Sequence, residues 1–221
     1  MERNGRQENP WDERAQAYRE SAPHASGPDL DLLVEWAGPG EARAALDVGT
    51  GGGHLARRLR EAGFTVTTAD PSAGMWPDVI CRAEELPFPA ASFDLVGSRI
   101  AAHHYADDEA GLAEMARVTR DVVLLEDLLF VDERIEEAEK LRDPSHVRTR
   151  TLEEWRDLFA AHGLRVETTE VIERHTSYSA WLERCGCSGE TAERTRELLA
   201  HRLDGDDYLS TVFLIKGRKE R

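Results

Sequence analysis

The feature that most constrains the fold is a glycine-rich turn between an apolar strand and a helix. Leu46-Asp47-Val48-Gly49-Thr50-Gly51-Gly52-Gly53-His54 overlaps the apolar run Ala44–Val48 and leads into the amphipathic stretch Leu55–Glu61. Glycines can adopt positive φ and present their N–H groups to an anionic or zwitterionic ligand near a helix N-terminus. A tight turn without a ligand is the alternative, although glycines cost folding entropy that an ordinary turn need not spend.

Two common nucleotide-binding loops do not fit this turn. The dinucleotide fingerprint G-x-G-x-x-G/A, started at Gly49, places His54 where a small residue must pack helix against strand. A Walker loop needs Lys directly after its last glycine, where this chain has His54. The turn therefore disfavours a nicotinamide-dependent oxidoreductase, which stays open as an alternative, and excludes an NTP-binding loop.

Strands and helices alternate along the chain. Short apolar or β-branched runs predict strands at Ala44–Val48, Thr65–Thr68 (ending at Asp70), Val79–Cys81, Phe93–Ser98, Val122–Leu125, Arg165–Glu173 and Leu209–Lys216. Helical spacing predicts helices at Leu55–Glu61, Glu109–Val118, Glu133–Arg142 and Leu152–His162, and a helix-rich insertion at Ser179–Arg202. The alternation predicts an α/β fold with a seven-stranded, mostly parallel sheet and helices on both faces.

The composition of the chain disfavours several classes of binding partner. Lys and Arg total 28 against 43 Asp and Glu, and the net charge of −15 repels nucleic acid and anionic lipid. The N-terminus lacks an apolar core segment, and no run of 18 apolar residues occurs. The three cysteines, Cys81, Cys185 and Cys187, lack the companion ligands of a zinc site. We therefore expect a cytoplasmic monomer or homodimer that binds no nucleic acid, membrane or metal.

Asp47 ahead of G-x-G-x-G resembles the class I S-adenosylmethionine (SAM)-dependent methyltransferases, in particular the branch around the ubiquinone/menaquinone-biosynthesis C-methyltransferases. The resemblance spans most of the chain and implies a Rossmann-like sheet that holds SAM at the ends of its first strands. In that family the turn faces the amino-acid part of SAM, and its acidic residue orients the ammonium. These roles are carried to Asp47, Gly49, Thr50, Gly51 and Gly53.

The second strand ends in Asp70-Pro71-Ser72, where Rossmann-type folds place the carboxylate that binds ribose hydroxyls. A turn or helix-capping Asp is the alternative. Met75 resembles the family residue that lies against adenine, and a core Met is equally open.

Two further segments extend the resemblance. Arg82-Ala83-Glu84-Glu85-Leu86-Pro87-Phe88 is similar to the family's A-E-x-L-P-F segment, in which the Ala backbone and the following acid meet the adenine edge. This implies such roles for Ala83 and Glu84. The segment that ends in Ser98-Arg99 is similar to the one that closes the site beside the transferred methyl. Ser98 and Arg99 are therefore expected to line the SAM pocket, mostly through backbone atoms.

Histidines supply the candidate bases. His103 and His104 follow the fourth strand, and imidazole can accept a substrate proton near neutral pH. Capping or core hydrogen bonding is an equal alternative. Arg142–Arg148 resembles a segment of uncharacterised relatives and concentrates two arginines and a histidine. The chemistry of these side chains predicts that Arg148 pairs an anionic or enolic substrate and that His146 deprotonates it. A capped helix start at Asp143-Pro144-Ser145 is again an equal alternative.

The N-terminal segment Ser21–Leu30, with Tyr18 ahead of it, looks like the lid of small relatives. In that case Tyr18 and His24 approach SAM from above, whereas a flexible leader is the alternative. We expect one domain over 1–221: lid and helices at 1–40, a SAM-binding core at 41–130, substrate-side insertions and helices at 131–205, and the last strand at 206–221.

The resemblance implies in-line transfer of the SAM methyl group to a carbon, oxygen or nitrogen of a small molecule, leaving S-adenosylhomocysteine (SAH). His103 or His104 is the expected base, with Arg99, His146 and Arg148 near the acceptor. A SAM-binding scaffold that does not methylate and an NAD-dependent oxidoreductase remain as alternatives.

Overall fold

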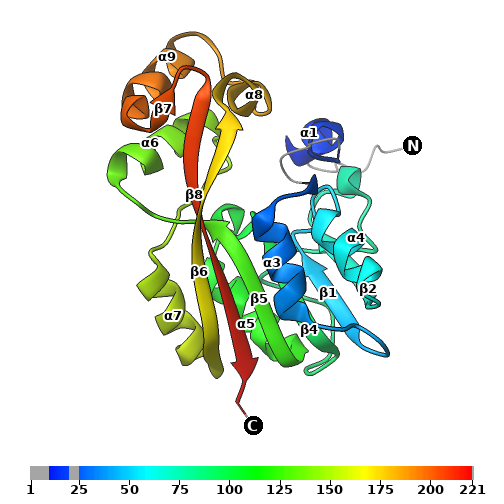
Figure 1. The fold of residues 1–221 in the computed structure, drawn as a ribbon. Helices are drawn as coiled ribbons and strands as arrows, with labels where there is room; N and C mark the ends of the chain where they lie inside the picture. The colour runs from blue at the N-terminus through cyan, green and yellow to red at the C-terminus, as the bar shows by residue number, and fades with distance from the viewer. Residues whose placement is uncertain (1–9, 20–24, 221) are drawn as a thin grey trace, which may run out of the picture.

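An eight-stranded sheet runs through the protein (Figure 1), for which the computed structural model describes residues 10–19 and 25–220. The strands are β1 Ala44–Val48, β2 Thr65–Asp70, β3 Val79–Ile80, β4 Phe93–Arg99, β5 Thr119–Leu128, β6 Leu164–Ser177, β7 Leu203–Asp204 and β8 Asp207–Lys219. Their order is β3-β2-β1-β4-β5-β8-β6, and β7 pairs with β8 off this path. Neighbours from β3 to β5 are parallel, whereas β8 is antiparallel to β5 and β6.

This topology confirms the predicted Rossmann-like, mostly parallel sheet, with each of the seven predicted strands in place. The additional strand, β7, has two residues and pairs with the start of β8. So short a segment carries no alternation that a sequence pattern can register.

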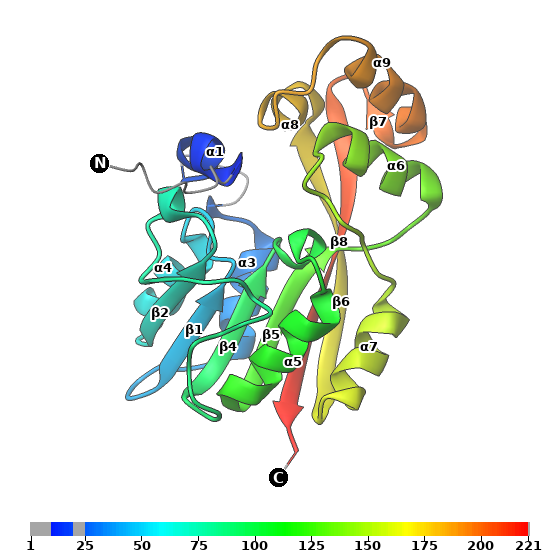
Figure 2. The same ribbon diagram turned by 180° about the vertical axis from the view of Figure 1, so that it is seen from behind.

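Helices cover both faces of the sheet, as Figure 2 shows from the side opposite to Figure 1. They are α1 Pro10–Arg19, α3 Pro28–Ala37, α4 His54–Glu61, α5 Asp108–Val118, α6 Glu133–Arg142, α7 Leu152–Ala161, α8 Tyr178–Glu183 and α9 Gly189–Leu198, with 3₁₀ turns η1 Ala73–Met75, η2 Ala102–His104 and η3 Ala200–Arg202. Adjacent strand residues face opposite sides. Leu46 therefore packs in the core under α5 and α7, and Ala45 in the core under α3 and α4.

Side-chain caps explain where several helices begin. The Asp107 carboxylate accepts the backbone N–H of Ala110 at the start of α5. Thr151 and Glu154 form a capping box at the start of α7, which satisfies backbone donors that have no helical partner. These caps fix the start of α5, which packs against β4 and β5, and the start of α7, which packs against β6.

The strands β6 and β8 are longer than predicted and project beyond the sheet (Figure 1). Their outer ends carry α6, α8 and α9, and we call these elements together the cap. The cap has its own small core, which includes Tyr178, Trp181 and Tyr208. Along β6 exposed and half-buried residues alternate, so no apolar run marks the outer part of this strand.

The helix α1 lies over the carboxyl end of β2. The Asp12 carboxylate accepts a hydrogen bond from the Ser72 hydroxyl at 2.5 Å and another from the Gly74 N–H at 2.9 Å. Arg19 stacks 3.8 Å from the ring centroid of Trp76. Both Figure 1 and Figure 2 place α1 and the cap at the same end of the sheet. In the described residues no helix is long and apolar enough to cross a membrane.

Candidate active site

The glycine turn leaves bare backbone at the carboxyl end of β1. Gly49, Gly51 and Gly53 have φ values of 65°, 49° and 74°, a left-handed conformation that favours glycine. A Cβ on Gly49 would lie 2.7 Å from the Cβ of Ala101, so the chain approaches too closely there for a side chain. Gly53 caps α4, while Gly51 faces open space.

Two buried acids hold this turn. Asp47 Oδ2 accepts hydrogen bonds from the Thr50 hydroxyl at 2.6 Å and the Ala56 N–H at 3.1 Å. Asp70 accepts one from the Gly51 N–H and one from the Ser72 N–H, each at 2.9 Å. Burial raises the pKa of Asp47 to about 6 and also raises the pKa of Asp70. Each acid therefore holds the backbone of the turn through hydrogen bonds.

A cleft of about 990 Å³, here called the outer cleft, opens above this edge of the sheet. Its lining includes one expected base, His104, and eight residues expected to contact the cofactor: Tyr18, Gly49, Gly51, Asp70, Pro71, Met75, Ala83 and Glu84. A second space of about 420 Å³ continues it behind the turn, lined in part by Asp47, Thr50 and Arg99. The structure thus brings the turn, the end of β2 and the segment after β3 to one cavity.

Other expected cofactor contacts lie outside these spaces. Ser72 is fully buried beneath α1, and Ser98 is fully buried with its hydroxyl 2.7 Å from the Tyr105 hydroxyl. Gly53 lines neither space, and His24 lies outside the described residues. Arg99 does line the second space but is only 9% exposed, and its side chain donates hydrogen bonds to Asp29 at 2.5 Å and to Glu126 at 2.7 Å.

Glu84 lines the outer cleft and also holds the loop opposite. Its Oε1 accepts hydrogen bonds from the backbone N–H of Ala106 at 2.8 Å and of Asp107 at 3.3 Å. Burial opposes the charged form, but these bonds and the guanidinium of Arg82 lower the pKa of Glu84. Glu84 is therefore charged at neutral pH and fixes the chain that follows η2.

Three lining residues have no motif in the sequence. Trp11 contacts the rings of Tyr18 and His104 edge-on, at centroid distances of 5.6 and 4.5 Å. Ile100 lies directly after β4 with a φ of 51°, an uncommon conformation for a β-branched residue. Tyr105 closes the floor beside Gly49. The position of Ile100 directly after a predicted strand was the one available signal, because ligands collect at such strand ends.

A third space, the inner cleft of about 600 Å³, lies between the sheet and the cap. Tyr18, Ile100 and His104 line both the inner and the outer cleft. His103 lines the inner cleft alone. The two cavities therefore meet at a shared wall that carries one of the expected bases.

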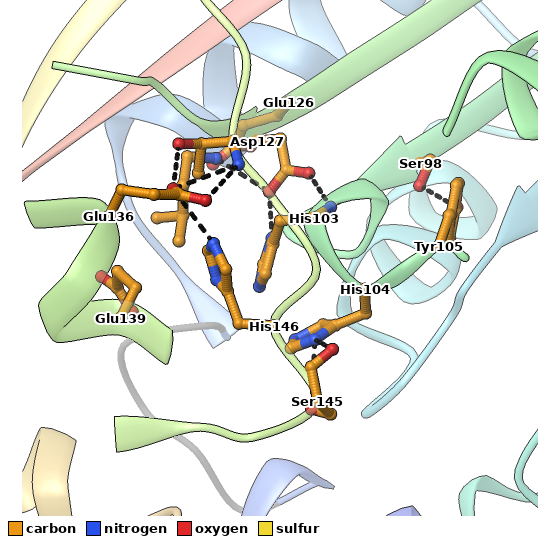
Figure 3. A network of polar contacts seen from close by, with 12 residues as sticks. Ser98, His103, His104, Tyr105, Glu126, Asp127, Glu136, Glu139, Ser145 and His146 are labelled. Carbon is orange, nitrogen blue, oxygen red and sulfur yellow. Dashed lines mark hydrogen bonds and ion pairs between the residues drawn. The ribbon is translucent and has the colours of Figure 1, made fainter. Parts of the chain in front are cut away.

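His103 is held by Asp127, the last residue but one of β5 (Figure 3). Nδ1 of His103 lies 2.5 Å from Asp127 Oδ1, and the His103 backbone N–H donates to Oδ2 at 2.7 Å. Burial opposes the charged imidazole, but the charge of Asp127, the hydrogen bond to it and the charge of Glu139 raise the pKa of His103. The carboxylate therefore fixes the orientation of this ring and increases its basicity.

His104 has the opposite electrostatic environment. Burial and the charge of the neighbouring His103 lower its pKa well below the ordinary value. Its Nδ1 lies 3.2 Å from both the carbonyl oxygen and the hydroxyl of Ser145. At neutral pH His104 is an uncharged imidazole whose Nδ1 proton is donated to Ser145.

The remaining polar residues expected at the acceptor do not line the clefts. His146 is 5% exposed, with Nε2 3.2 Å from Glu136 and its ring centroid 5.2 Å from that of His103 (Figure 3). Arg148 is exposed and pairs with Glu154 at 2.9 Å. The expected anion partner therefore points away from the cavity. Within the described residues, no group of three His, Cys, Asp or Glu side chains could hold a metal ion.

Comparison with known proteins gives consistent results. Residues 46–124 match the sequence profile of a methyltransferase domain. The chain is 29% identical over 231 residues to the uncharacterized methyltransferase YcgJ of Bacillus subtilis, covering 94% of this chain and 90% of that protein. The crystal structure of YcgJ superimposes with a TM-score of 0.78 at 27% identity, over 87% of this chain and 98% of that one.

Two other relatives mark the range of chemistry on similar chains. The malonyl-[acyl-carrier protein] O-methyltransferase of Pseudescherichia vulneris is 32% identical over 126 residues, which are 52% of this chain and 47% of that protein. The [4+2]-cyclase SpnF shares the fold with a TM-score of 0.61 at 18% identity, over 86% of this chain and 79% of that one. None of these matches singles out the quinone-biosynthesis branch.

Proposed function

Because this chain is a class I SAM-dependent methyltransferase, we propose that it transfers the methyl group of SAM to a carbon, oxygen or nitrogen of a small molecule by in-line displacement. The observation that carries the proposal is the wall of Tyr18, Ile100 and His104 that the outer and inner clefts share. Cofactor in the outer cleft and acceptor in the inner cleft would meet there. Both clefts are lined by apolar and aromatic side chains together with a few polar groups, which is typical of small-molecule sites.

The outer cleft fits SAM in its donors, acceptors and apolar surface. Backbone at Gly49 and Gly51 offers close approach for the amino-acid end. Asp70 keeps lone pairs beyond the two hydrogen bonds it accepts, which suits ribose hydroxyls. Met75 and Ala83 give an apolar wall for adenine. When bound there, SAM supplies an electrophilic methyl group.

The remaining work of the protein is alignment and exclusion of water. In this proposal residues 1–40 form the lid and first helices, 41–130 hold SAM, 131–205 cover the acceptor and 206–221 form the last strand of one domain. Trp11 and Tyr18 from α1 line the outer cleft, and Trp181 from α8 lines the inner one. The acceptor is thereby enclosed on several sides.

For an acceptor that starts protonated, we assign the base to His103 rather than His104. The Nδ1–H of His103 donates a hydrogen bond to Asp127, which leaves Nε2 of this ring to accept a proton from the acceptor. The raised pKa of His103 lies nearer the range of an effective base, whereas the low pKa of His104 makes it a weak one. His104 then positions the acceptor at the wall between the clefts.

Calorimetric titration with SAM, SAH and NAD tests the cofactor. We expect SAM and SAH to bind, and Asp70→Ala to weaken them about 10- to 100-fold because hydrogen bonds to a charged group are lost. The exposed Asp157→Ala on α7 is the matched control and should bind as the native protein does. Tighter binding of NAD, or no binding of SAM, would overturn the proposal.

Methyl transfer itself needs a second measurement, because SpnF shows that a cyclase can share this fold. Incubation with methyl-labelled SAM and pools of small acids, phenols and amines should yield a labelled small molecule. SAM binding without any labelled product would favour a SAM-binding protein that does not methylate.

A further inference from the structure

The inner cleft gathers cations in a chain that carries a net charge of −15. Its lining includes Arg142, Arg174 and Arg184, and a single acid, Glu139. Clefts lined by one sign of charge attract ligands of the opposite sign. Whether these guanidinium groups are available depends on the partners that each one already has.

Arg174, on β6, is engaged within the protein. Its guanidinium lies 3.5 Å from Asp29 and 3.7 Å from Glu126, in the same cluster as Arg99. These contacts tie α3 to β5 and β6. We therefore assign Arg174 a structural role and do not count it among the groups that bind a ligand.

Arg142, the last residue of α6, is 6% exposed, and its guanidinium has few hydrogen-bond partners among the described residues. It lies 3.5 Å from Glu139, and it donates one hydrogen bond, at 3.5 Å, to the carbonyl of Trp181. Its Nε has no hydrogen-bond partner in the described part of the chain. A guanidinium has five N–H donors, so Arg142 has capacity for a further acceptor.

Arg184 follows α8, is half-buried and lines the same cleft. Among the described residues, none forms an ion pair or a hydrogen bond with its side chain, whose charge is thus uncompensated by direct contact. Burial and the neighbouring charge of Arg142 lower its pKa. A partly buried, unpaired charge is costly, and an anionic ligand would offset this cost.

We propose that the acceptor is an organic monocarboxylic acid, bound in the inner cleft with its carboxylate between Arg184 and Arg142. The planar guanidinium fork matches a carboxylate in two parallel hydrogen bonds. Glu139 lies in the same lining and disfavours a dianion such as phosphate. The ring of Trp181, with Ile100 and Leu128, provides apolar surface for the body of the acid.

This inference rests on the proposed function, because it places the nucleophilic group of the acid toward His103 and His104. It replaces Arg148 as the anion partner, since Arg148 pairs with Glu154 outside the cleft. The two arginines come from α6 and α8, so the carboxylate would also join two elements of the cap.

Matched probes test the inference on protein saturated with SAH. The three monohydroxybenzoates and their amides have nearly the same shape and differ in charge. In saturation-transfer NMR titrations we expect the acids to bind, and the amides to bind at least about tenfold more weakly, because a charge-assisted pair is lost. Equal binding of acids and amides, no binding of either, or tighter binding of inorganic phosphate would overturn the inference.

Arginine variants test where the carboxylate binds. Arg184→Gln should weaken acid binding about tenfold or more and leave amide and SAH binding unchanged. Arg184→Lys should retain part of the affinity because it keeps the charge but not the fork. Arg148→Gln is the control and should bind as the native protein does. Loss of acid binding in Arg148→Gln but not in Arg184→Gln would contradict the assignment.

The two proposals fail in different ways. If SAH does not bind to the native protein, the proposed function fails before any acid is added. If SAH binds and the acids show no preference over the amides, only the inference about the acceptor fails.

Discussion

The outer and inner clefts are built in different ways. The outer cleft is lined largely by short chain segments that follow β1, β2, β3 and β4, and the backbone of Gly49 and Gly51 is among them. The inner cleft is formed by single side chains from distant elements, such as His103 after β4 and Arg184 after α8. Under the proposed function, this difference would make backbone shape important for the cofactor and side-chain chemistry important for the acceptor.

The largest effect should come from removing the proposed base. His103→Gln should lower kcat about 100- to 10,000-fold, the usual contribution of general-base catalysis, while SAM affinity stays unchanged. Single-turnover rates with methyl-labelled SAM, alongside titration with SAH, measure both. His162→Gln, at the end of α7, is the control. An unchanged kcat, or an equal loss of SAH affinity, would break the separation between the clefts.

Asp127→Asn should shift the pH profile with a smaller loss of rate. Because Asp127 raises the pKa of His103, the acid limb of kcat should move to lower pH in the variant. The same interaction stabilises the folded protein fully below the unfolded pKa of histidine and is lost as pH rises through the folded pKa. An acid limb that stays in place would show that His103 is not the titrating base.

Gly51→Ala tests the backbone side of the comparison. A Cβ in the left-handed region costs about 1–2 kcal/mol, and here it would also project into the outer cleft. We expect KM for SAM to rise about tenfold, with KM for the acceptor unchanged. Gly205→Ala is the matched control, because Gly205 has a φ of 62° and open space but lies in the β7–β8 turn. Equal effects of the two variants would mean that strain alone is responsible.

Glu126→Gln should have the smallest effect. Burial raises the pKa of Glu126 to about 8, although Arg99 opposes the shift, so this acid is mostly protonated at pH 7. Its proton is lost as pH rises through about 8, and folding stability falls from about pH 4 to that value. At pH 7 the free energy of unfolding of the variant should therefore lie within about 1 kcal/mol of the native value. Above pH 8 the variant should lose less stability than the native protein, because glutamine does not ionise. Thermal melts against pH measure the difference.

The residues of the outer cleft could be predicted from the sequence more readily than the properties of the inner cleft. Asp47, Gly49, Gly51 and Asp70 could be placed from the sequence because a strand, a turn and a helix fix them locally. Adjacent His103 and His104 were named as bases, but their opposite pKa shifts depend on Asp127 and on each other. Such coupling appears only once β4 and β5 are paired.

The cap could not be predicted in the same detail. The outer part of β6 alternates polar and half-buried residues, so its extension to Ser177 depends on pairing with β8. The two arginines and the histidine within Arg142–Arg148 predict an anion partner at Arg148, but the arginine that lines the cavity after α8 is Arg184. Its position follows from the packing of Tyr178 and Trp181 of α8 in the cap core. The direction in which the side chains of such a short helix face is set by tertiary packing and not by the local sequence.

The shared wall also has a kinetic consequence. Tyr18, Ile100 and His104 border both clefts, so a ligand in either one restricts the space through which the other is exchanged. Binding and release of one ligand then depend on whether the other is bound, and the rate of turnover depends on the order in which the two ligands bind. Because direct transfer needs both ligands bound together, double-reciprocal plots of initial rates should give intersecting lines.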